Sequence, residues 1–318
     1  MSRAAESGPP PGIGHRFGAV SFLAVAITVA LVSFLLWQSW DEVREGLVKA
    51  SPIVLLAGWL LATVSTLTAF LAFAELCNAV HRQPLPLTAL GHLYFTAQLM
   101  KHLPGRVWGV AYQGVMTRGR IPMLEWVAIN IGYLALSTYF ALLFALVVVL
   151  AWVAPWLGAM ALLLGIALLA LAWRPWAGEL VVKGVGLISR RGRDRLHGAV
   201  RSTASVPRSS KIRFVWLSLL GWALYAAAWS LYGAAYPELG AAAGIHLSAS
   251  YTLAWVIGYL SLVTPSGIGV RELIFAGLSI GYPTDIVLYG MLIGRAGLLA
   301  TDLALGTVFW PYQNDARK

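Results

Sequence analysis

Long apolar segments follow one another along the chain. Six of them reach the roughly 20 residues that a helix needs to cross a bilayer, and they cover residues 18–37, 53–75, 124–153, 155–173, 214–236 and 285–310. Two further apolar regions, at about 86–122 and 247–282, are interrupted by proline and glycine. The pattern predicts an all-α polytopic membrane protein with about six full transmembrane helices and two broken segments.

The composition supports a membrane location. Of the 318 residues, 59% are hydrophobic and 11% are charged, and the mean hydropathy is +0.74, whereas a soluble domain carries about 25% charged residues. The 14 Trp and 12 Tyr suit the aromatic belts at membrane interfaces. We expect a polar tail at 1–17, one transmembrane domain at 18–312 and a C-terminal tail at 313–318. The first span ends in Trp-Gln-Ser-Trp rather than a cleavage site, so we expect it to be retained.

The basic residues predict the orientation. The net charge is +10, and 19 of the 23 Lys and Arg fall in four segments, at 1–17, 76–123, 174–213 and 313–318. Placing these segments on one side satisfies the positive-inside rule, so the charge does not indicate a nucleic-acid partner. We expect a multi-pass protein of the cytoplasmic (inner or plasma) membrane, with the N-terminus and the basic loop 174–213 in the cytoplasm and residues 38–52 and 237–246 outside.

This topology closes only if both broken segments leave on the side from which they enter. They would then be re-entrant helical hairpins that approach from opposite faces. Such an arrangement resembles the inverted-topology repeats of secondary transporters, in which interrupted helices indicate a binding site near the midplane. A competing topology makes 247–264 a full span and leaves the C-terminus outside.

The second break is the sequence Thr-Pro-Ser-Gly-Ile-Gly-Val-Arg-Glu, residues 264–272. Proline and glycine open a helix here, and inside a membrane the freed backbone groups need protein or water partners. A helix that restarts after the break directs N–H groups at a cavity, which suits an anion such as phosphate. The candidate binding residues are Pro265, Ser266, Gly267, Gly269, Arg271 and Glu272. An ordinary turn outside the membrane, with the last two residues in water, is the alternative.

The first break offers a second group of candidates beside Trp108, namely Lys101, His102, Pro104, Gly105 and Arg106. Basic pockets between helices bind lipid headgroups, so these residues could form a cationic pocket for a lipid phosphate at the inner leaflet. They could equally be positive-inside residues that anchor the end of a helix.

Two ionisable residues, Arg295 and Asp302, lie inside the last predicted span. Seven positions return to nearly the same helix face, about 10 Å along the axis, and charged groups at this depth are expected to face the bundle interior. Glu272 is the candidate partner of Arg295. The alternative is an ion pair with a structural role only.

Together, the motifs Lys-x-x-Pro-Gly at 101–105 and Pro-x-Gly-x-Gly-x-x-Glu at 265–272 resemble the lysylphosphatidylglycerol synthase/flippase transmembrane-region family over about residues 18–312. The usual Pro-Gly-Gly of that family reads Pro-Ser-Gly here. The resemblance implies movement of lipids or lipid-linked molecules between leaflets. Some members add a cytosolic synthetase domain. This chain stops at Lys318, so aminoacyl transfer is not expected.

We therefore expect a non-enzymatic lipid flippase or transporter for an anionic or lipid-linked substrate of the phospholipid or polyprenyl-phosphate type. No P-loop is present, which predicts passive or ion-coupled movement, with Asp302, Glu272 or His102 as proton carriers. One cysteine and no zinc or haem motif predict no cofactor. Membrane lipids are the expected partners, and the pattern specifies no oligomeric state. The alternatives are a glycosyltransferase using Asp41 and Glu42 on a lipid-linked sugar, and a non-catalytic membrane partner of an envelope-biosynthesis enzyme.

Overall fold

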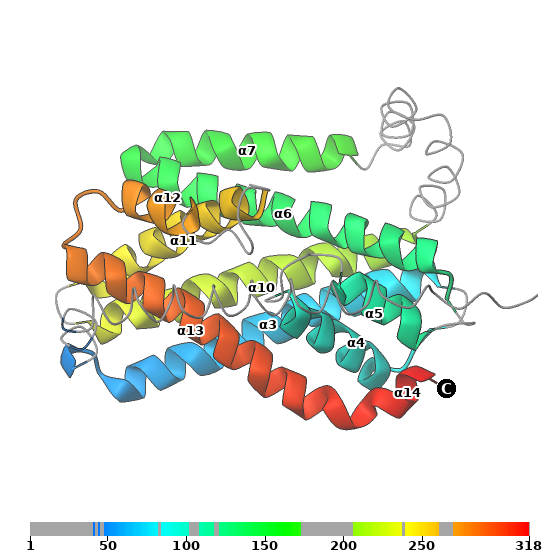
Figure 1. The fold of residues 1–318 in the computed structure, drawn as a ribbon. Helices are drawn as coiled ribbons and strands as arrows, with labels where there is room; N and C mark the ends of the chain where they lie inside the picture. Colours follow the sequence, from blue (N-terminus) through cyan, green and yellow to red (C-terminus); the bar gives the residue numbers. More distant parts are fainter. Residues whose placement is uncertain are drawn as a thin grey trace, which may run out of the picture.

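The computed structural model describes residues 41, 44, 48–81, 84–101, 108–117, 121–172, 206–236, 239–260 and 270–317. These residues form helices joined by turns, with no strand among them, as the apolar pattern predicts (Figure 1). In chain order the helices are α3 (Pro52–Val80), α4 (Leu87–Met100), α5 (Trp108–Met116), α6 (Met123–Val153), α7 (Pro155–Ala172), α10 (Arg208–Ala235), α11 (Gly240–Leu260), α12 (Val270–Leu278), α13 (Thr284–Phe309), the 3-10 turn η2 (Trp310–Tyr312) and α14 (Gln313–Arg317).

Four of the described helices are long and apolar enough to cross a membrane. They are α3, α6, α10 and α13, which correspond to four of the six predicted spans. The fifth prediction, 155–173, corresponds to α7, whose apolar segment Pro155–Leu171 is shorter. The first, 18–37, lies outside the described residues.

Helices α3 and α10 form the most extensive helix pair and run antiparallel over their whole length (Figure 1). At one end the N–H of Ser51 donates to the carbonyl of Ala235 at 3.0 Å. At the other end Arg213 forms an ion pair with Glu75 at 2.6 Å. This pair is the centre of the bundle, and the other helices pack around it.

Along the sequence, a pair of shorter helices separates α3 from α6, and another pair separates α10 from α13. Helix α4, of 14 residues, packs against α5, of nine residues. Helix α11, of 21 residues, packs against α12, also of nine residues. The order of a long helix, a shorter helix, a nine-residue helix and a long helix thus occurs twice, in α3–α6 and in α10–α13.

Two helix boundaries differ from the sequence-based expectation. Residues 240–246, expected in an outer loop, form the first turns of α11, because Ala241 to Ala243 are strong helix formers and continue the helix beyond its apolar part. Helix α10 begins at Arg208, so the last residues of the predicted basic loop 174–213 are helical. Pro207 precedes this helix, and proline favours such helix starts.

Described residues of segments that the sequence assigns to opposite sides of the membrane lie at opposite ends of the bundle. At one end His246 lies between Trp152, with ring centroids 4.6 Å apart, and the Tyr282 hydroxyl at 3.2 Å from Nδ1. At the other end the Thr88 hydroxyl donates to Asp315 at 3.0 Å. Each contact joins residues that the sequence assigns to one side, and the orientation in the membrane stays a prediction.

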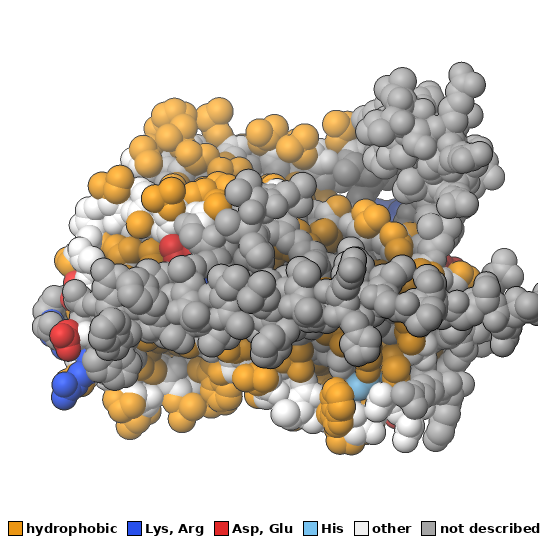
Figure 2. Space-filling model, in the orientation of Figure 1, with side chains coloured by type: hydrophobic (Ala, Val, Ile, Leu, Met, Phe, Trp, Pro, Cys, Tyr) orange, Lys and Arg blue, Asp and Glu red, His pale blue; other side chains and the backbone are white. Residues whose placement is uncertain are grey.

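The outside of the bundle is strongly apolar. Orange hydrophobic side chains cover much of the visible surface that is not grey (Figure 2). On α7, which packs on α6, Trp156, Leu163 and Leu164 are each more than 60% exposed. Large apolar side chains that are exposed together in this way are uncommon on soluble monomers. They fit contact with lipid tails.

The close approach of α11 to α10 depends on Gly233 and Gly244. A Cβ at Gly244 would lie 2.2 Å from the carbonyl oxygen of Trp229, and a Cβ at Gly233 would lie 2.4 Å from the oxygen of Gly240. Both contacts are with backbone, which cannot rotate away. The two helices must therefore separate if either glycine gains a side chain.

We expect Gly244→Ala to lower the free energy of unfolding by about 1–3 kcal/mol through overpacking. Thermal unfolding of the detergent-purified protein is the measurement. Gly132→Ala is the matched control, because no atom lies within 4 Å of its Cβ position and alanine is the better helix former. Equal melting temperatures of Gly244→Ala and wild type would contradict the close packing.

Candidate functional site

A cavity of about 780 Å³ lies in the middle of the bundle. Residues of α3, α4, α5, α6, α10, α11, α12 and α13 line it, so all eight helices of the two similar series contribute to its wall. Pockets for drug-sized ligands measure roughly 300–1,000 Å³. The cavity therefore has room for a complete lipid headgroup, and it is the candidate site.

The cavity brings the two predicted breaks together. Lys101 follows the last residue of α4, and Arg271 is the second residue of α12. Both side chains line the same cavity, although 170 positions separate them in the sequence. The ends of two different helix pairs thus each place one cation at a shared space.

Lys101 forms an ion pair with Asp302 of α13, with 2.8 Å between Nζ and Oδ2. The Asp302 side chain is 1% exposed, whereas that of Lys101 is 37% exposed. A buried carboxylate is costly unless it is paired, so Lys101 neutralises Asp302 while its own ammonium group stays in reach of the cavity. This pairing was not predicted from the sequence.

Arg271 has a different environment. Its guanidinium carbon lies 4.3 Å from the centre of the Tyr251 ring, a cation–π contact. Within the described part of the chain no carboxylate lies within ion-pair distance of Arg271. The carboxylate of the adjacent Glu272 is paired with Arg295 instead. Arg271 therefore supplies the cavity lining with a positive charge whose described neighbour is an aromatic ring.

The structure separates the predicted site residues into three groups. Lys101, Arg271 and Asp302 line the cavity. Glu272 and Arg295 form the predicted ion pair, which joins α12 to α13 outside the cavity lining. Arg295 and Asp302 share a helix but have different partners. The remaining candidates lie outside the described residues, namely His102, Pro104, Gly105, Arg106, Pro265, Ser266, Gly267 and Gly269.

Aromatic side chains on two helices line the cavity, and we call this set of residues the aromatic ladder. It consists of Trp222, Tyr225, Trp229 and Tyr232 on α10 and Tyr251, Trp255 and Tyr259 on α11. Sequence reasoning assigned the aromatic residues to membrane interfaces and missed the ladder. The signal was present, because intervals of three and four positions place side chains on one face of a helix.

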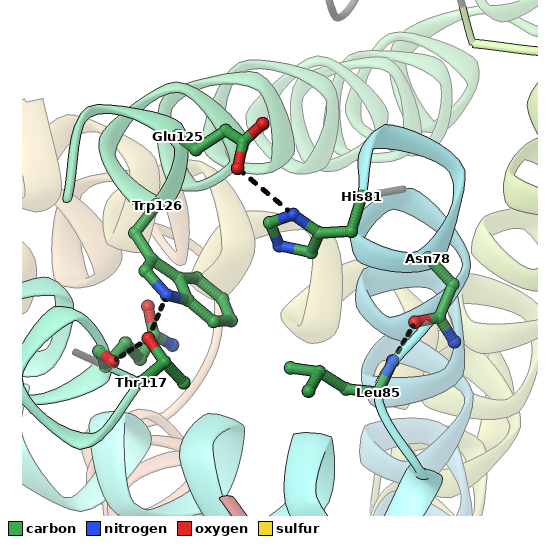
Figure 3. Close-up of polar contacts among 7 residues, drawn as sticks. Asn78, His81, Leu85, Thr117, Glu125 and Trp126 are labelled. Carbon is green, nitrogen blue, oxygen red and sulfur yellow. Dashed lines mark hydrogen bonds and ion pairs between the residues drawn. The ribbon is translucent and has the colours of Figure 1, made fainter. Parts of the chain in front are cut away.

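Amide side chains from α5 and α6 also line the cavity, and we call this group the amide wall. Asn130 donates from Nδ2 to Oε1 of Gln113 at 2.7 Å, and both residues line the cavity. Next to these amides, the Trp126 indole N–H donates to the Thr117 hydroxyl at 2.5 Å. That hydroxyl donates to the backbone carbonyl of Gln113 at 2.7 Å (Figure 3). These bonds fix α5 against α6 and hold the amide wall in place.

A second polar contact joins the same region to the end of α3. Nδ1 of His81 lies 3.3 Å from the Glu125 carboxylate (Figure 3), and the backbone N–H of Leu85 donates to Asn78 at 3.0 Å. Burial lowers the pKa of His81, and the nearby Glu125 carboxylate offsets part of this effect. The neutral imidazole is thus the form that the fold favours.

No family model, curated protein or solved structure matches the chain. Among the described residues, no three His, Cys, Asp or Glu side chains gather in a way that could hold a metal ion. The described side chains that line the cavity include two cations, one carboxylate, amides, hydroxyls and aromatic rings.

We expect Lys101→Ala to destabilise the protein more than Asp302→Asn, by about 2–4 kcal/mol against about 1 kcal/mol. Loss of Lys101 leaves a buried carboxylate without this counter-charge, whereas loss of the carboxylate leaves an ammonium in contact with cavity water. Unfolding of both variants and the double variant in detergent measures the coupling. A double variant less stable than Lys101→Ala would contradict the pairing.

Stability should fall on acidification because of His81. Its pKa is lower in the folded state than in the unfolded chain, so the unfolded chain binds the extra proton as the pH falls through about 6.5. We expect the melting temperature of wild type to fall over this range and that of His81→Gln to fall less. Identical pH profiles would show that His81 remains hydrated.

Proposed function

We propose that the chain is an integral membrane lipid flippase or transporter that moves an anionic or lipid-linked substrate between leaflets. One observation carries the proposal: Lys101 and Arg271, from the ends of two different helix pairs, face one cavity of about 780 Å³. A phosphate would bind at these cations, the headgroup would occupy the cavity, and the acyl or prenyl tails would stay in lipid. Charged groups inside membrane domains mark substrate pathways.

The repeated order of helices suggests how such a site forms. We propose that α3–α6 and α10–α13 are inverted repeats and that α4/α5 and α11/α12 are re-entrant hairpins. Antiparallel α3 and α10, which occupy the same place in the two series, support this interpretation. Transporters with inverted repeats bind substrate between the repeats, at discontinuous helices. Alternating access would then open the cavity first to one end and then to the other.

The remaining assignments follow from this proposal. The basic end of the bundle, which includes Arg208, would face the cytoplasm. Membership of the lysylphosphatidylglycerol synthase/flippase family rests on the two motifs alone. The glycosyltransferase alternative gains no support from the cavity, because Asp41 is exposed and does not line it, and Glu42 lies outside the described residues.

We expect purified protein in liposomes to exchange fluorescent anionic or polyprenyl-phosphate lipids between leaflets faster than empty vesicles. Arg271→Gln should slow the exchange roughly tenfold to a hundredfold, because a charge-assisted bond to phosphate contributes about 1.5–3 kcal/mol. Arg208→Gln, an exposed arginine outside the cavity, is the control and should match wild type.

Exchange no faster than in empty vesicles, across several anionic and polyprenyl-linked lipids, would overturn the proposed function. Exchange that is fast but unaffected by Arg271→Gln would remove the assignment of this arginine as the phosphate anchor.

A further inference from the structure

We propose that the substrate carries a sugar, or a closely similar polyol, on a single phosphate, and that the aromatic ladder is the path of this headgroup through the cavity. The inference rests on the proposed function and specifies its substrate class. It depends on the ladder, on the amide side chains of the lining and on the charge of the cavity, which are three separate features of the described residues.

The ladder offers ring after ring at similar spacing. On α10 the ring centroids of Trp222 and Tyr225 are 5.3 Å apart and those of Tyr225 and Trp229 are 6.1 Å apart. The line passes to α11 through Trp229 and Tyr251 at 5.4 Å. Farther along α11, Trp255 and Tyr259 form a second ring pair at 5.6 Å. Trp222, Tyr225, Trp255 and Tyr259 are the less buried rings of the ladder, and they offer a bound group several weak contacts in turn, as a pathway requires.

Aromatic rings and amides together suit a sugar. The face of an aromatic ring is negative and attracts the slightly positive C–H face of a pyranose, while the tyrosine hydroxyls and indole N–H groups hydrogen-bond to sugar hydroxyls. Gln98 and Asn130 also line the cavity. The amide of Gln98 can both donate and accept, while the Asn130 nitrogen already donates to Gln113 and Trp126, which leaves the Asn130 carbonyl oxygen as an acceptor. A headgroup with one apolar face and a rim of hydroxyls matches both walls.

The net charge of the cavity lining indicates how many phosphates the headgroup carries. Among the described lining residues the ionisable side chains with a formal charge are Lys101, Arg271 and Asp302, and two cations with one anion leave a single positive charge. One phosphodiester neutralises it. A headgroup that also carries an ammonium would meet repulsion from Lys101 and Arg271, and Arg271 already occupies the face of Tyr251.

A hydrocarbon tail fits the cavity less well than a sugar. An acyl or prenyl chain bound there would remove Arg271, Lys101 and the amides from water without replacing their hydrogen bonds, and polar groups buried in this way are costly. Recognition of a choline-type headgroup by the aromatic rings and binding of a tail are both outcomes that the experiment separates from the proposal.

The test compares three fluorescent probes in the same liposomes: a prenyl phosphoglucose, the same prenyl phosphate without glucose, and phosphatidylcholine. We expect wild type to exchange the phosphoglucose fastest. Trp255→Leu should slow it about threefold to tenfold, the loss of one aromatic contact, and leave the bare prenyl phosphate unchanged. Trp216→Leu is the matched control, because Trp216 lies on the outside of α10 and is 68% exposed.

Tyr259→Leu provides a second ladder variant if Trp255→Leu does not purify as folded protein. Equal effects of the ladder variants on the two prenyl probes, or fastest exchange of phosphatidylcholine, would overturn the sugar assignment and leave the flippase proposal standing. Exchange of none of the probes, by wild type as well, would overturn the proposed function itself. Slower exchange of both prenyl probes in Arg271→Gln identifies the phosphate anchor independently of the sugar.

Discussion

A charge inside an apolar helix bundle needs a partner, and the ion pair between Lys101 and Asp302 shows how this chain provides one. The carboxylate on α13 is almost fully buried, so the end of α4 must lie against it. That contact joins the first helix series to the second. Because the ammonium remains partly exposed, a hydrated space must adjoin the pair, and the central cavity is that space.

The spans were the most predictable part of the molecule. Apolar length alone located α3, α6, α10 and α13, because bilayer thickness fixes how long such helices must be. Helix ends were less predictable. Helix α11 begins at Gly240 and helix α10 at Arg208, and both starts lie in sequence that hydropathy assigns to a loop.

Three of the predicted site residues line the candidate cavity, and one of the two ion pairs around them was predicted. Proline, glycine and ionisable residues within apolar sequence identified Lys101, Arg271 and Asp302, and the pairing of Glu272 with Arg295 followed from their shared depth. Nothing local relates Lys101 to Asp302, since that pair depends on how α4 packs on α13. The aromatic ladder had a periodic signal, but abundant Trp and Tyr are equally typical of membrane interfaces.

The two cations of the cavity have unlike partners, and this difference gives them unlike roles. Lys101 is neutralised by a carboxylate, so its contribution to binding an anion requires competition with Asp302. Arg271 rests on an aromatic ring, which attracts a cation without neutralising it. On the proposed function, a phosphate entering the cavity would meet Arg271 on its aromatic ring and Lys101 already paired with Asp302. A single anchor at Arg271, combined with weak contacts along the aromatic ladder, would then hold the headgroup without trapping it at any one place. Movement of a substrate requires this balance, because a site that binds too strongly does not release.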